Sequence, residues 1–151
     1  MIRDTDSLKQ TQAAWHSVRR FQAMVKANIA GGMDGLQSWK FGDAAHSLVL
    51  IFAYAVLEDC LRIIQDEQQI ATTGPSLQKL LKACKSRLPW KDFAAVEAGH
   101  ALRNRIAHDQ HIAPRAESWQ YVDAIEAELL GWHVLDAPPQ VEYAIVRGKL
   151  E

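Results

Sequence analysis

The chain has 151 residues, of which 48% are hydrophobic and 23% are charged, and its formal net charge is −1 at pH 7. This length and composition are typical of one globular domain with a buried core, and they exclude a largely disordered chain. The near-neutral charge excludes a molecule-wide basic field for nucleic acid, so such a contact would require a local basic patch.

Cysteine usage and hydropathy point to a cytoplasmic protein outside the membrane. Cys60 and Cys84 lack the spacing of metal ligands, and we expect both to be buried thiols in a reducing compartment. The polar first ten residues do not resemble a signal peptide. The longest apolar run, residues 48–57, has about half the length that a membrane span requires.

Helical periodicity and capping signals predict five helices. The expected helices span residues 5–30, 43–70, 77–87, 90–108 and 114–132. Gly31 and Gly32 end the first, residues 33–42 form a connection, and Asp43 caps the second. Residues 48–57 are apolar on all sides, which places the second helix at the centre of the bundle. A buried strand is the alternative there, but the length and the alanines favour a helix.

The predicted fold is therefore all-α, a single-domain bundle of about five helices over residues 1–132. Residues 133–151 are expected to form a short extended arm, because Pro138 and Pro139 exclude further helix. Within the arm, residues 141–146 alternate loosely and are compatible with a strand. A lone strand needs a partner, and a second subunit would supply one, making the arm a dimer contact.

The candidate chemistry lies late in the fourth predicted helix, where Arg103, Asn104 and His108 follow one another closely. A guanidinium offers a fixed fork of donors for phosphate oxygens, and an imidazole exchanges protons near neutrality. At about 100° per residue, Asn104 and His108 share one quadrant of the helix with His100, and with His111 if the helix continues that far. Arg103 lies at the border with an apolar stripe formed by Ala95, Gly99, Leu102 and Ile106.

The chain resembles the HEPN domains (higher eukaryotes and prokaryotes nucleotide-binding) over residues 5–132. The resemblance lies in this motif, in its place in the penultimate helix, and in a strongly apolar second helix in which Glu58 follows the apolar segment. The similar members carry an Arg-polar-x(3–5)-His motif. The resemblance implies a homodimeric bundle with metal-independent endoribonuclease activity, no cofactor, and often a toxin–antitoxin or phage-defence role. It implies Arg103, Asn104 and His108 as catalytic residues, with Glu58 in support. Members neutralised by a nucleotidyltransferase typically have Tyr two residues after the His, where this chain has Gln110.

Structural alternatives stay open for each residue. His108 is alternatively a helix C-terminal histidine favoured by the helix dipole, and Asn104 a helix cap. Arg103 is alternatively a salt-bridge partner of Glu58 or Glu97, and a carboxylate can orient an arginine that also binds phosphate. Spacing alone is weak evidence for a site. Arg105 and His111 form a second arginine–histidine pair and are further supporting candidates.

Two other interpretations of the sequence have weaker support. The spacing of His100, His108 and His111 fits no common zinc pattern, so no metal site is predicted. A lysine-rich segment would supply a local basic patch for RNA, although a solvated face is the simpler interpretation. Its basic residues are Lys79, Lys82, Lys85, Arg87 and Lys91. The alternative function is a non-catalytic dimeric scaffold for RNA, a nucleotide or a protein such as an antitoxin or defence-system partner.

Overall fold

The computed structural model describes the backbone of residues 1–30 and 36–140 and the side chains of residues 1–27 and 41–140. These ranges contain helices and irregular segments but no strand. The helices are α1 (Thr5–Ala30), α2 (Leu36–Gln68), α3 (Leu77–Cys84), α4 (Phe93–Asp109) and α5 (Arg115–Gly131). The prediction of an all-α bundle of about five helices is confirmed. The expected strand at residues 141–146 and the stop at Gly31–Gly32 lie outside the described residues.

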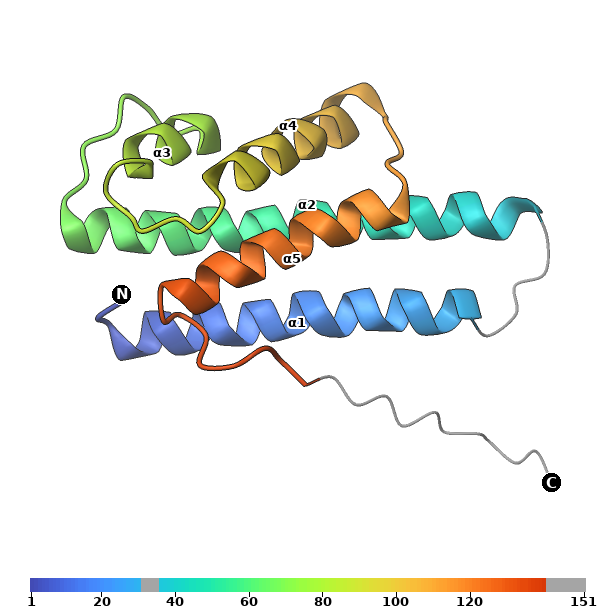
Figure 1. Cartoon of the computed structure of the whole chain (residues 1–151), viewed down its shortest axis with the longest axis horizontal. Coiled ribbons are helices and arrows are strands. Elements are labelled where there is room, and N and C mark those ends of the chain that lie inside the picture. Colours follow the sequence, from blue (N-terminus) through green and yellow to red (C-terminus); the bar gives the residue numbers. More distant parts are fainter. Residues whose placement is uncertain (31–35, 141–151) are drawn as a thin grey trace.

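Helix α2 is the centre of the bundle and packs against all four other helices (Figure 1). In this view α1 runs along one side of α2, α3 and α4 lie on the other side, and α5 crosses in front. Leu50, Leu57 and Leu61 of α2 are fully buried. The predicted central position of the apolar segment is thus confirmed, although Leu48 within it is 57% exposed.

The start of α2 differs from the prediction. The helix begins at Leu36 and runs through Gly42, which is buried inside it. Packing overrides the low helix propensity of glycine, which costs only about 1 kcal/mol. Asp43 does not cap α2. Its Oδ1 instead accepts hydrogen bonds from the backbone N–H of Arg115 at 3.1 Å and from the Arg115 Nε at 2.9 Å. The carboxylate therefore caps the first turn of α5.

The start of α4 is fixed by α5. Predicted to begin near residue 90, α4 begins at Phe93 after the N-cap Asp92, whose Oδ1 accepts from the backbone N–H of Ala95 at 2.9 Å. The Glu128 carboxylate, 1% exposed, accepts from the backbone N–H groups of Lys91 at 2.8 Å and Asp92 at 2.7 Å. A buried carboxylate is tolerated there because N–H donors just before a helix satisfy it and the helix dipole favours its charge.

Smaller deviations concern α3, α1 and the arm. Helix α3 ends at Cys84 rather than at Arg87, because the chain turns at Lys85. On α1, the large apolar side chain of Phe21 is 36% exposed rather than buried. After α5, the side chains of Val134 and Leu135 are buried in the core of the bundle. The part of the predicted arm that the structure describes therefore begins against the bundle.

A buried histidine predicts acid sensitivity. His46 of α2 is fully buried, and Trp119 of α5 donates its indole N–H to His46 Nδ1 at 3.0 Å. Burial, with the nearby charges of Arg115 and Lys26, lowers the pKa of His46 to about 4, while Asp43 opposes this shift. The unfolded chain therefore binds this proton first. The contribution of neutral His46 to the free energy of unfolding is therefore complete above about pH 6.5 and is lost as the pH falls toward 4.

We expect the free energy of unfolding to fall by about 2 kcal/mol between pH 7 and 4.5 through this group. Urea unfolding of the wild type and of His46→Gln at both pH values measures the difference, since glutamine keeps a neutral acceptor for Trp119. An equal loss in both proteins would assign the acid sensitivity to other groups.

Candidate active site on α4

The guanidinium of Arg103 is held by its neighbour on α4. Arg103 is half-buried, and its Nη1 donates to Asn104 Oδ1 at 3.0 Å. Its Nε is buried and has no hydrogen-bond partner within the described part of the chain. Glu58 pairs with Arg62 at 2.5 Å, and the Arg103–Glu58 ion pair that was one structural alternative for Arg103 is not formed. One donor of Arg103, the buried Nε, is thus left without a partner in the described part of the chain.

His100 joins this pair from the preceding turn. The residue is 8% exposed, and its Nε2 lies 3.2 Å from Asn104 Nδ2. Burial lowers the pKa of His100, and the charge of Arg103 lowers it further, while Glu58 and Glu97 act in the opposite direction. The imidazole is therefore neutral at neutral pH. The sequence placed His100 and Asn104 on one quadrant of the helix, and the structure brings them into contact.

Close packing at Gly99 fixes the position of α4 beside α2 and α5. A Cβ on Gly99 would lie 2.2 Å from the Tyr54 hydroxyl and 2.7 Å from Tyr121 Cγ. The Tyr54 hydroxyl donates to the carbonyl of Val96 at 2.7 Å. Only glycine permits this approach. Sequence reasoning placed Gly99 in the apolar stripe but did not identify Tyr54, whose phenol anchors the helix that carries the site.

His108 lies on the exposed surface of α4. It is one helical turn beyond Asn104 and on the same side of the helix, since residues four apart are neighbours. Its imidazole makes no hydrogen bond within the residues that the structure describes. His108 also lies in the last turn of α4, where a histidine interacts favourably with the helix dipole. Its position is therefore compatible both with a catalytic role and with a role in stabilising the helix end.

The end of α4 separates His111 from this face. The helix stops at Asp109 because Gln110 has a left-handed conformation with φ of 52°. The backbone N–H groups of Gln110 and His111 both donate to the Arg105 carbonyl. His111 therefore leaves the helix, and its ring nitrogens lie 3.4 Å from Arg105 Nη2. The second predicted pair is in contact, but it is not part of the His100–Asn104–Arg103 group.

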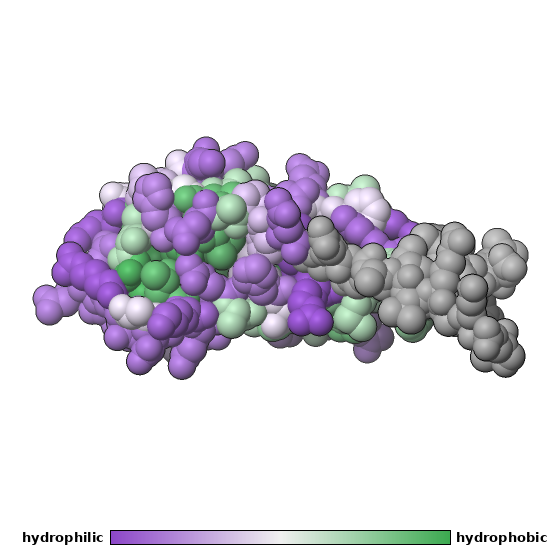
Figure 2. All heavy atoms as spheres, turned by 90° about the horizontal axis from the view of Figure 1, so that it is seen from below, coloured by the Kyte–Doolittle hydropathy of each residue, from purple (hydrophilic) through white to green (hydrophobic). Residues whose placement is uncertain are grey.

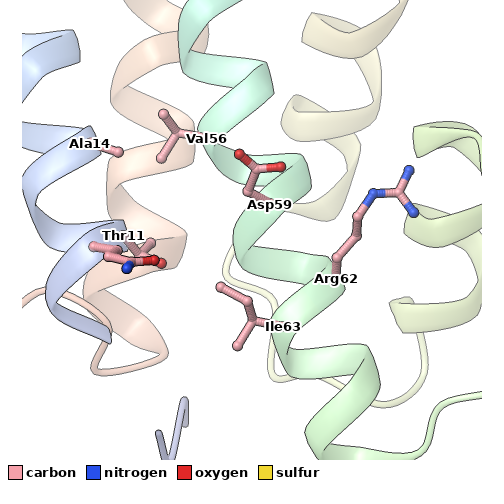
Figure 3. A pocket seen from close by; sticks show the side chains of 7 residues that line it. Thr11, Ala14, Val56, Asp59, Arg62 and Ile63 are labelled. Carbon is pink, nitrogen blue, oxygen red and sulfur yellow. The ribbon is translucent and has the colours of Figure 1, made fainter. Parts of the chain in front are cut away.

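A groove on the described surface lies elsewhere, between α1 and α2 (Figure 3). Its volume is about 400 Å³, and Ala14, Val56 and Ile63 contribute apolar walls. Two charged residues, Arg62 and Asp59, line this groove. The Arg62 guanidinium points away from α1 in Figure 3 and pairs with Glu58. Asp59 is therefore the charged lining residue whose side chain is not paired in this way. A carboxylate in an apolar groove disfavours phosphate. Figure 2 shows apolar surface gathered toward the end of the bundle where α1 begins.

Metal-ligating side chains do not cluster in threes or more within residues 1–27 and 41–140. Cys60 and Cys84 are buried free thiols, as expected, and burial raises the pKa of Cys60 to about 12. Among the described helices, none combines the length and apolar character needed to cross a membrane. Comparison of the chain with protein-family models, curated proteins and solved structures finds no match.

Proposed function

We propose that this chain is a metal-independent endoribonuclease of HEPN type that cleaves RNA in a cleft between two copies of the chain. The observation that carries the proposal is the Arg103 guanidinium, which is oriented by Asn104 and retains an unpartnered donor on a helix that also exposes His108. The cytoplasmic location rests on cysteine usage and hydropathy, and the toxin–antitoxin or phage-defence role with its antitoxin or defence-system partner rests on the sequence resemblance.

RNA supplies its own nucleophile in this mechanism. The 2′-oxygen attacks phosphorus, the bond from phosphorus to the 5′-oxygen breaks, and the products are a 2′,3′-cyclic phosphate and a 5′-hydroxyl. His108 takes the proton of the 2′-hydroxyl or gives one to the leaving oxygen, and the two copies share these roles. Arg103 stabilises the negative charge that develops on the phosphoryl oxygens, and Asn104 positions the phosphate.

The geometry of a single copy favours a dimeric site. Five residues of helix separate Arg103 from His108 by about 7.5 Å along the axis and by roughly 140° around it. Their side chains therefore point in different directions. A second copy would let the arginine of one chain and the histidine of the other face the same phosphate.

An outward stripe on α2 is a suitable surface for the second copy. Phe41 is 65% exposed and Leu48 is 57% exposed, and Phe52 and Ala55 continue the stripe at spacings of four and three residues. An uncovered apolar stripe of this kind typically marks an interaction site. Glu58 follows on the neighbouring side of the helix and contributes to the environment of His100, so this surface borders the site.

The test is cleavage of a structured RNA in the presence of EDTA by wild type, His108→Ala and His16→Ala, purified identically. His16 is exposed on α1 and serves as the matched control. We expect wild type and His16→Ala to leave cyclic-phosphate ends and His108→Ala to be slower by about 10²-fold or more, because it lacks the proton carrier. Equal cleavage by all three proteins would contradict the role of His108.

The second candidate function is a non-catalytic scaffold, and the apolar groove between α1 and α2 favours it. A groove with apolar walls and one carboxylate suits a protein segment better than RNA. Absence of cleavage by the folded wild type, together with retained dimerisation, would favour this function over the ribonuclease.

A further inference from the structure

The hydrogen bonds between Arg103, Asn104 and His100 can run in only one direction. A guanidinium has donors and no acceptor, so the Asn104 atom that faces Arg103 must be the amide oxygen. The amide NH₂ then faces His100, and because it too can only donate, His100 Nε2 must be the acceptor. The neutral imidazole therefore carries its proton on Nδ1.

A second proton on His100 would break this arrangement. Nε2 would then be a donor facing the Asn104 NH₂, and two donors cannot form a hydrogen bond. Rotating the amide by 180° would satisfy His100, but it would turn the NH₂ toward the Arg103 donors. Either orientation leaves one contact unmade, so Arg103 is held only while His100 is neutral.

We propose that His100 is a positioning residue that acts through Asn104: its unprotonated Nε2 fixes the amide, and the amide oxygen fixes the Arg103 guanidinium. The catalytic meaning of this assignment rests on the proposed ribonuclease function. The assignment itself concerns the tautomer of one buried histidine, which can be measured without RNA.

The surroundings of His100 suit this role. Arg103 and Glu97 lie near His100 on its own helix, and Glu58 lies near it on α2. The Tyr54 ring of α2 also lies beside it, with the centroids of the Tyr54 and His100 rings 6.2 Å apart. The burial that accompanies the close packing at Gly99 disfavours the charged imidazole. The two carboxylates favour the charged form, but burial and the charge of Arg103 outweigh them, so the pKa of His100 is lowered and the neutral form is favoured.

The direct test is nitrogen NMR of the folded protein labelled with ¹⁵N-histidine, comparing wild type, Asn104→Asp and His108→Ala at neutral pH. In the wild type, and in the control His108→Ala, we expect His100 to have a protonated Nδ1 and an unprotonated Nε2. In Asn104→Asp the new carboxylate accepts from Nε2–H, so we expect that nitrogen to become protonated and the pKa of His100 to rise. A protonated Nε2 in the wild type, or no change in Asn104→Asp, would overturn the proposal.

Cleavage by His100→Phe separates positioning from the proposed function. Phenylalanine keeps an aromatic ring beside Tyr54 but has no acceptor for Asn104. We expect RNA cleavage to slow by about tenfold to a hundredfold because Arg103 is no longer fixed, with the acid side of the pH–rate profile altered. Undiminished cleavage would overturn the positioning role. A wild type that does not cleave RNA would refute the proposed function. The NMR measurement of the His100 tautomer would still test the hydrogen bonds from Arg103 through Asn104 to His100.

Discussion

Replacing Arg103 with alanine is expected to lower the rate of RNA cleavage by about 10³-fold, the range seen when a donor to transition-state charge is removed. Arg103 presents its remaining donors next to the Asn104 contact, and alanine removes all of them. The loss should appear in the single-turnover rate constant rather than in substrate affinity, because the interaction develops with the charge on the phosphate.

Arg103→Lys is the informative comparison, since it keeps the positive charge but loses the planar fork that Asn104 orients. We expect it to recover only part of the lost rate. Arg105→Ala, two residues further along α4, removes a neighbouring exposed arginine on a different side of the helix and serves as the control. A uniform decrease in both alanine variants would point to general electrostatic attraction of RNA instead of a specific catalytic contact.

Gly99→Ala is expected to reduce the free energy of unfolding by about 2–3 kcal/mol, despite the higher helix propensity of alanine. The new methyl group would overlap the Tyr54 hydroxyl and the Tyr121 ring, so α4 must move away from α2 and α5. Thermal unfolding followed by circular dichroism should show a decrease in Tm of roughly 5–10 °C for a domain of this size. Because the displaced helix carries Arg103 and Asn104, cleavage should decrease as well.

Gly131→Ala at the end of α5 is the matched control. A Cβ there would approach only the flexible Lys91 side chain, with its nearest atom at 3.3 Å. We expect this variant to unfold at or slightly above the wild-type temperature, because alanine favours helix and the lysine can move aside. Equal destabilisation of the two variants would show that close packing at Gly99 is not special.

Much of the fold follows from local patterns. The bounds of α1, Thr5–Ala30, match the prediction, and the apolar segment of α2 lies at the centre of the bundle. The start of α2 could not be predicted, because Asp43 has the properties of a helix cap and its actual partner, Arg115, is distant in the sequence. The start of α4 depends in the same way on Glu128 of another helix.

The candidate site shows the same division. Helical spacing predicts that His100 and Asn104 are neighbours, and the structure places them in contact. The pattern does not reveal that His100 is buried against Tyr54, so the sequence suggested only a metal ligand or an unassigned polar residue. The exit of His111 from the helix depends on the left-handed Gln110, a residue type with no strong preference for that conformation.

The central position of α2 has a consequence for cooperativity. Apart from the packing of α4 on α5, the main helix contacts among the elements described all involve α2, so most of the packing is lost once α2 detaches. The bundle is therefore suited to all-or-none unfolding rather than to a stable partly folded intermediate. The geometry around Arg103 is then maintained by the stability of the entire fold, so a destabilising substitution far from α4 would reduce the fraction of competent molecules without altering a single contact in the site.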